Sequence, residues 1–148
     1  MYICYMKQTK LLEFQFNDGG RSHSKFTGST GDCVVRAIAI ATNQDYESVY
    51  QRCAEINKKC GLPKSCRNGV NTKSKHFKEY MQELGFTWVV TNQIGSSEKV
   101  HLRADELPNG KIICKLSKHV VAVINHKLLD TYDCSRDGTR MVYGYWQK

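Results

Sequence analysis

An almost unbroken apolar run is the feature of this sequence that most constrains its fold. The run extends from Val34 to Ala41, and Arg36 is the one polar residue in it. The residues just before it are small and polar, and Asp32 or Thr30 can serve as a helix N-cap. A helix that is apolar nearly all round lies in the middle of a core. The sequence therefore predicts a buried helix that begins close to Cys33.

The position of Cys33 at this helix start gives its thiol a chemical role. The first N–H groups of a helix have no partner within the helix and carry a partial positive charge. Both effects favour the thiolate, which is the nucleophilic form of cysteine. Cys33 is therefore the predicted nucleophile of the chain.

The rest of the pattern favours an α+β domain. Apolar residues recur at helical spacing from Asp45 to Lys58, and a third helix, capped by Asn71 or Thr72, is expected to end at Gly85. Leu11–Phe16 alternates as a half-buried strand does. After the helices the period changes, and five strands are expected at Phe86–Val90, Lys111–Leu116, Val120–Ile124, Leu128–Tyr132 and Arg140–Trp146. We expect N-terminal helices, the first of them buried, packed on a C-terminal antiparallel sheet.

Two residues, Asn125 and His126, separate two of these strands and predict a tight hairpin. With these two at the turn, His119 faces Tyr132 and Val121 faces Asp130. Cross-strand partners share a face, so His119 and Asp130 lie diagonally on one face of the sheet. Asp133 falls on the opposite face, and only a bulge or a longer turn would exchange the two aspartates.

Together these residues outline a cysteine-dependent acyl-transfer site. Cys33 would attack an acyl carbon, and His119 would accept the thiol proton and pass it to the leaving group. Asp130 would orient the imidazole, and the backbone N–H of Cys33 would donate to the oxyanion. The neighbouring charge of Asp32 would oppose the thiolate.

At this point the residues resemble the papain-like cysteine peptidase superfamily. The similarity lies in a helix-initial cysteine within Gly31–Ile38, followed by His119 at the start of a strand and Asp130 on the returning strand. The whole chain also looks like small proteins of phages and mobile elements, which share the runs Asp18–Ser22, His101–Pro108 and Asp130–Asp133. The resemblance implies a papain-like fold and a thiol protease or isopeptidase acting on a protein or peptide, with a host protein as one target. Deamidation or transamidation on the same triad remains open.

Papain-like enzymes usually carry an amide side chain shortly before the nucleophile to complete the oxyanion hole. The segment Phe26–Gly31 has none. The candidates to replace it are side chains of the same segment or of the preceding strand: Thr27, Ser29, Thr30, Gln15 and Asn17.

A basic segment supports an alternative function. Seven basic residues and no acidic one lie between positions 58 and 78, in a chain of net charge +8: Lys58, Lys59, Lys64, Arg67, Lys73, Lys75 and Lys78. Such a segment suits a non-catalytic module of the same fold that binds nucleic acid or an acidic host protein. A solvated surface loop is the simpler interpretation of the same charges.

Length and composition set the remaining expectations. The 148 residues predict one domain, spanning 1–148. There is neither a membrane-spanning run nor a signal-peptide pattern, so we expect no membrane partner and a cytoplasmic location, the host cytoplasm if a phage encodes it. The seven cysteines are odd in number and are expected to be reduced. No Cys-x-x-Cys pair, Walker loop, dinucleotide fingerprint or zincin motif is present, so no metal or cofactor is predicted.

Overall fold

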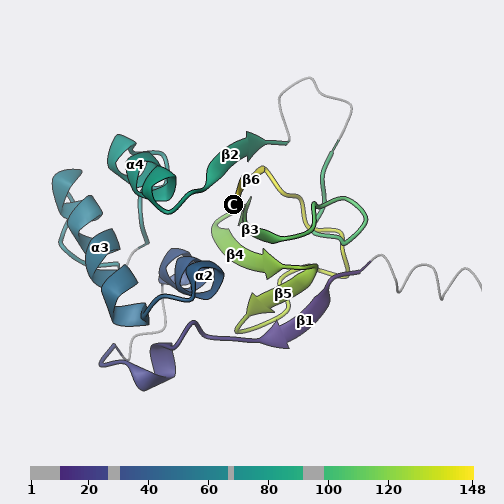
Figure 1. Cartoon of the computed structure of the whole chain (residues 1–148), viewed down its shortest axis with the longest axis horizontal. Coiled ribbons are helices and arrows are strands. Elements are labelled where there is room, and N and C mark those ends of the chain that lie inside the picture. Colours follow the sequence, from purple (N-terminus) through teal and green to yellow (C-terminus); the bar gives the residue numbers. More distant parts are fainter. Residues whose placement is uncertain (1–10, 27–30, 67–68, 92–98) are drawn as a thin grey trace, which may run out of the picture.

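The computed structural model describes residues 11–26, 31–66, 69–91 and 99–148 and forms an α+β fold (Figure 1). Its sheet has six strands in the order β1-β5-β4-β3-β6-β2. The strands are β1 (Glu13–Phe16), β2 (Thr87–Val90), β3 (Lys111–Leu116), β4 (His119–Ile124), β5 (Lys127–Asp130) and β6 (Gly144–Gln147). The helices are α2 (Cys33–Thr42), α3 (Tyr46–Lys59) and α4 (Lys75–Glu83), and a 3-10 turn, η1 (Arg21–His23), precedes them. The α+β class expected from the sequence is confirmed.

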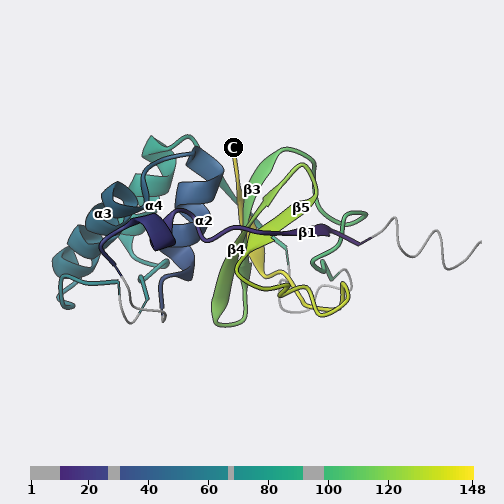
Figure 2. The ribbon, with the colours of Figure 1, turned by 90° about the horizontal axis from the view of Figure 1, so that it is seen from below.

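The apolar helix α2 begins at Cys33 and lies at the centre of the fold. Seven of its ten residues are buried, including Arg36. It packs against β4 and shares one hydrophobic core with α3, α4, β3 and β6. In Figures 1 and 2 the three helices lie together on one side of the strands. The N-terminus of α2 therefore meets the sheet where β4 begins.

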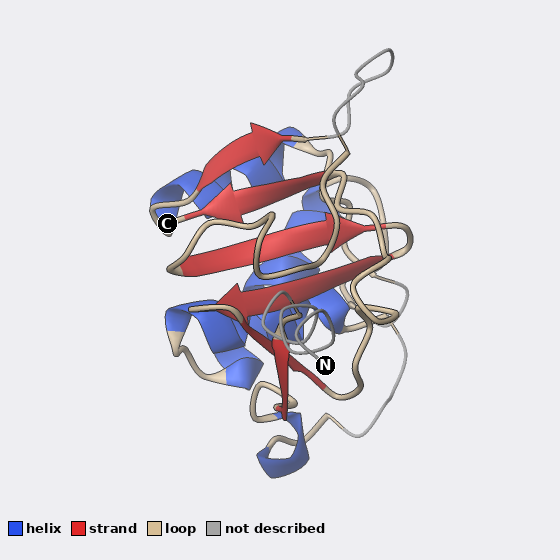
Figure 3. Cartoon of the chain, turned by 90° about the vertical axis from the view of Figure 1, so that its right-hand side faces the viewer, coloured by secondary structure: helices blue, strands red, loops and turns tan. Residues whose placement is uncertain are grey.

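A second core lies on the other side of the sheet. Alternate residues of β3, β4 and β5, such as Cys114, Val121 and Leu128, pack there against Leu102 and Val142. The segments that carry these last two residues are irregular, and Figure 3 shows them as loops in front of the strands. Loops therefore cover the face of the sheet opposite the helices, and one of them runs from β5 to β6.

The sheet differs from the expected C-terminal antiparallel sheet in one respect. The strand β1 comes from the N-terminal part of the chain and pairs with β5 in parallel, so the sheet is mixed. The expected half-burial of this strand is also wrong, because all four of its residues are exposed, including Phe14 and Phe16. Alternation showed the strand but not that it would lie at the edge of the sheet.

The start of α4 and the start of β6 also differ from expectation. Ser74 caps α4 by accepting a hydrogen bond from the Phe77 N–H, whereas the side chain of Asn71 accepts one from Lys73 in the preceding turn. The strand expected at Arg140–Trp146 is shorter and begins at Gly144, and Met141 before it forms an isolated bridge with His101.

The hairpin between β4 and β5 has the predicted register. Ile124 pairs with Lys127 and Val123 with Leu128. Both turn residues, Asn125 and His126, have positive φ, as a two-residue type I′ turn requires. This register places His119 and Asp130 at the same end of the hairpin.

Candidate active site

The first residue of α2, Cys33, is partly exposed at the helix N-terminus. Asp32 occupies the N-cap position, but its side chain makes no capping hydrogen bond. The first N–H groups of α2 therefore have no side-chain cap, and the positive end of the helix faces the thiol. The local sequence thus provides an anion-stabilising position for the Cys33 sulfur.

The imidazole of His119 joins this thiol to Asp130. The distance from His119 Nε2 to Asp130 Oδ2 is 2.6 Å. Asp130 also accepts a hydrogen bond from the backbone N–H of Thr131 at 2.7 Å. The ring of Tyr132 lies over His119, with 5.5 Å between the ring centroids. The structure thus pairs His119 with Asp130, as hairpin register predicts, and the charge of His119 acts on the Cys33 thiol at the start of α2.

The surroundings of the three groups shift their pKa values in complementary directions. Burial raises the pKa of Cys33, but hydrogen bonds from His119 and the Val120 N–H, with the positive charges of His119 and Arg36, bring it below its ordinary value. Burial lowers the pKa of His119, yet its hydrogen bonds with Asp130 and with neighbouring thiols raise it to about 11. Burial raises the pKa of Asp130, and its contacts with His119, together with the charge of Arg36, outweigh burial and lower it. These shifts favour the thiolate of Cys33, the imidazolium of His119 and the carboxylate of Asp130.

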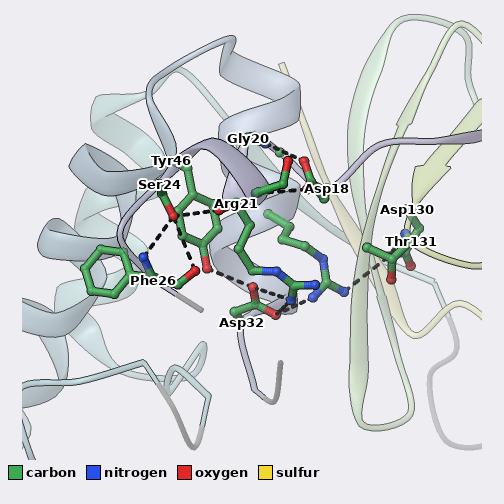
Figure 4. Close-up of polar contacts among 12 residues, drawn as sticks. Asp18, Gly20, Arg21, Ser24, Phe26, Asp32, Tyr46, Asp130 and Thr131 are labelled. Atoms are coloured by element: carbon green, nitrogen blue, oxygen red, sulfur yellow. Dashed lines mark hydrogen bonds and ion pairs between the residues drawn. The ribbon is translucent and has the colours of Figure 1, made fainter. Parts of the chain in front are cut away.

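A buried cluster of charges behind Cys33 was missed at the sequence level. Asp32 accepts hydrogen bonds from Arg21 at 3.1 Å, from Tyr46 at 2.8 Å and from Arg36. Arg36 also donates to Asp130 at 3.2 Å. Figure 4 shows Arg21 and Tyr46 directed toward Asp32, with Asp130 at the other end of the cluster. The cluster links α2 to the triad carboxylate.

This cluster gives the Asp32 carboxylate positive partners of its own. Two guanidinium groups and a hydroxyl bind the Asp32 carboxylate, so its charge is balanced within the cluster. The contribution that reaches Cys33 from this side is the positive charge of Arg36. The signal in the sequence was the four-residue spacing from Asp32 to Arg36, the single charge in the apolar helix.

The loop between β1 and η1 delivers Arg21 to this cluster. The carboxylate of Asp18 accepts hydrogen bonds from the N–H groups of Gly20 and Ser22. Gly19 has a φ of 70°, and a Cβ there would lie 3.1 Å from the backbone of Arg36. The segment Asp18–Ser22, one of the runs singled out in the sequence, thus packs against α2 and positions Arg21.

A second thiol, that of Cys134, also lies beside His119 and was not singled out in the sequence. Burial raises its pKa even though it is hydrogen-bonded to His119. Of the two thiols next to the imidazole, Cys33 is therefore the one poised as a thiolate. Sulfur, nitrogen and oxygen atoms of Cys134, His119 and Asp130 lie within 4.8 Å of one another and could hold a metal ion. The guanidinium of Arg36 on Asp130 opposes that use of the cluster, because it already neutralises the carboxylate.

Two of the oxyanion candidates lie in or after β1, where the Asn17 N–H donates to the backbone oxygen of Asp130 at 2.9 Å. Gln15 is exposed in β1, where it pairs with Leu129 of β5. The side-chain oxygen of Asn17 accepts a hydrogen bond from the Gly19 N–H. Thr27, Ser29 and Thr30 lie outside the described residues. The remaining candidate among the described residues is the backbone N–H of Cys33.

Two cavities flank the pair of Cys33 and His119. One, of about 550 Å³, has His119 in its wall together with Lys118, Tyr132, Arg136 and Arg140. The other, of about 590 Å³, is formed by aromatic and basic side chains that include Trp88, Trp146 and Lys115. Lys115 pairs with Val120, whose N–H donates to Cys33, so this second cavity lies on the thiol side.

The basic segment is dispersed over several elements. Lys58 and Lys59 end α3, Lys64 and Lys73 lie in loops, and Lys75 and Lys78 are in α4. All six are exposed, and Arg67 lies outside the described residues. Lys73 and Lys78 reach the wall of the larger cavity.

Comparisons with known proteins assign no family to this chain. No family model, curated protein or solved structure matches the chain. Within the described ranges, no helix combines the length and the apolar character needed to cross a membrane.

Proposed function

We propose that this chain is a papain-like cysteine hydrolase that cleaves a peptide or isopeptide bond. The observation that carries the proposal is the pairing of His119 with Asp130 at 2.6 Å, next to a Cys33 thiol whose pKa is lowered while that of the imidazole is raised. Opposite pKa shifts in two neighbouring groups are typical of a nucleophile and its acid–base partner.

The reaction follows from these protonation states. The Cys33 thiolate attacks the carbonyl carbon, and the N–H groups at the start of α2 stabilise the oxyanion. As the C–N bond breaks, His119 donates its proton to the leaving amine and a thioester remains on Cys33. A water molecule then loses a proton to His119 and attacks the thioester, and the C–S bond breaks to release the acid. The same thioester would serve deamidation or transamidation.

A polypeptide substrate fits the surroundings of the pair better than a compact small molecule does. His119 lines one cavity, and Lys115, on which the charge of Cys33 acts, lines another, so an extended chain can occupy more than one cavity near the reacting bond. The larger cavity presents Met81, Phe86 and Trp88, which favours an apolar residue on the acyl side.

Acylation by p-nitrophenyl acetate tests the proposal without knowledge of the substrate. We expect a burst of p-nitrophenolate and an acetyl group on Cys33, located by peptide mapping. Cys60 is also partly exposed but lies at the C-cap of α3, so it is the internal control. The burst should be absent in Cys33→Ala. Equal acetylation of Cys33 and Cys60, or an unchanged burst in Cys33→Ala, would refute the proposal.

A further inference from the structure

The cavity beside His119 has a strongly positive wall. Lys118, Arg136 and Arg140 contribute to it, and none of the described residues that line it is acidic. Among the described residues these three cations form no ion pair. Their positive potential is therefore directed into the cavity and not cancelled within it.

Arg140 connects this potential to the candidate catalytic centre. Its guanidinium donates a hydrogen bond to the backbone oxygen of Ser117 at 2.8 Å, and both residues line the same cavity as His119. Its charge also lowers the pKa of Cys134, and Cys134 is hydrogen-bonded to His119. A group bound by Arg140 would thus lie close to the imidazole.

The turn that carries Arg136 is rigid. Arg136 and Asp137 have φ values of 51° and 57°, a left-handed conformation that residues other than glycine rarely adopt. The backbone oxygen of Arg136 accepts two hydrogen bonds from Thr139, at 3.1 and 2.6 Å. Gly138 packs so closely that a Cβ there would lie 2.9 Å from Leu11. Strained backbone held by its surroundings is typical of functional positions, and here it presents a cation to the cavity.

We propose that this cavity binds a carboxylate of the polypeptide substrate on the leaving-group side of the scissile bond. This inference rests on the proposed hydrolase function and names the substrate class of that site. His119 lines the cavity and Cys33 does not, and the imidazole is the group that protonates the leaving amine. The planar guanidinium groups of Arg136 and Arg140 match a carboxylate, which accepts two parallel hydrogen bonds from such a group.

Acyl transfer to added amines measures this subsite directly. The enzyme is first acetylated with p-nitrophenyl acetate. An amine then attacks the thioester, the C–N bond forms, the C–S bond breaks and His119 takes the amine's proton.

Gly-Glu-amide, Gly-Gln-amide and Gly-Gly with a free terminus are compared as acceptors. Gly-Glu-amide carries the carboxylate on a side chain and Gly-Gly carries it at the chain end, so these two acceptors distinguish the two sources. We expect at least one of these two to be preferred over Gly-Gln-amide by about tenfold at low salt, the lower end of what one hydrogen bond to a charged group contributes.

The variants separate local from general charge effects. In Arg136→Gln/Arg140→Gln the preference should fall to about one. The control, Lys111→Gln/Lys127→Gln, removes two exposed charges that flank Ile124 at the other end of β4, and it should keep the preference. Acetylation of Cys33 with equal use of all three acceptors would overturn the carboxylate subsite and leave the hydrolase intact. Absence of acetylation would overturn the hydrolase itself. A preference that survives in the arginine variant would also overturn the assignment to these residues.

Discussion

At the residue scale, Asp130 has two roles that depend on its charge. Its side chain is buried, and one carboxylate binds both His119 at 2.6 Å and Arg36 at 3.2 Å. It therefore supports the imidazolium and neutralises a buried guanidinium at once. The choice of Asp130 over Asp133 followed from the two-residue turn alone, and the structure agrees because the hairpin has no bulge.

Replacing Asp130 by Asn should affect reactivity and stability together. The neutral amide leaves His119 without its counter-charge and Arg36 with Asp32 alone, so the pKa of His119 should fall and less Cys33 should be thiolate. We expect the alkylation rate of Cys33 near neutral pH to drop about tenfold, and the free energy of unfolding to fall by about 3 kcal/mol because a buried ion pair is broken. Iodoacetamide kinetics and urea denaturation measure the two effects.

Asp133→Asn is the matched control for this substitution. Asp133 is exposed, and its carboxylate accepts hydrogen bonds from Ser135 within the same turn. The variant should leave Cys33 alkylation unchanged. Equal losses of reactivity in the two variants would show that the hairpin register does not select the partner of His119.

The residues that sequence reasoning missed are those whose role depends on folding. Arg21 and Tyr46 come from separate segments and meet Asp32 only when η1 and α3 pack beside α2. Cys134 lies after β5 and reaches His119 through the path of the loop that follows. No spacing in the sequence relates these residues to one another, because each comes from a different segment and contributes a single contact.

At the scale of elements, the entry into α2 depends on the close approach of Gly19. The backbone there has φ 70°, and the position of a Cβ would be 3.1 Å from both Cα and the carbonyl oxygen of Arg36. The same loop holds Arg21 on Asp32. A side chain at Gly19 would therefore disturb the contact between the loop and the helix.

Gly19→Ala should destabilise the fold more than Gly61→Ala does. Gly61 has φ 81° with nothing within 4 Å of the added Cβ, so its substitution isolates the conformational cost. We expect Gly61→Ala to cost about 1 kcal/mol and Gly19→Ala roughly 2–3 kcal/mol, because backbone strain and crowding add. Thermal and urea unfolding measure both. Equal costs would contradict the close contact with Arg36.

Most elements could be predicted because each has a local signal. The apolar run gave α2 and its start at Cys33, and the Asn125–His126 pair gave the β4–β5 hairpin. The parallel pairing of β1 with β5 could not be predicted, because it joins segments more than a hundred positions apart in sequence and depends on how the whole sheet assembles. The late start of β6 at Gly144 could not be predicted either, because Met141 forms an isolated bridge with His101, a distant segment, outside the sheet.

At the scale of the whole molecule, one set of buried charges joins the helices to the sheet. Asp32 and Arg36 belong to the start of α2, and Asp130 ends β5. The thiol and the imidazole come from these same two parts, so their relative position depends on the packing of α2 against β4 and β5. The candidate site is therefore a product of the complete fold and not of either half.

The pH dependence of Cys33 alkylation tests the central claim most directly. Iodoacetamide is neutral, so its rate follows the thiolate fraction, and Cys60 in the same molecules supplies the reference. Because the pKa of Cys33 is lowered, its rate should rise at lower pH than that of Cys60 and exceed it about tenfold near neutral pH. The rate should then change little until His119 loses its proton, at a pKa of about 11.

His119→Ala completes the measurement. Without the imidazolium, burial of the thiol is no longer offset, so the pKa of Cys33 should rise and its profile should move to higher pH. A profile of Cys33 that coincides with that of Cys60 and does not move in His119→Ala would contradict a primed Cys33–His119 pair.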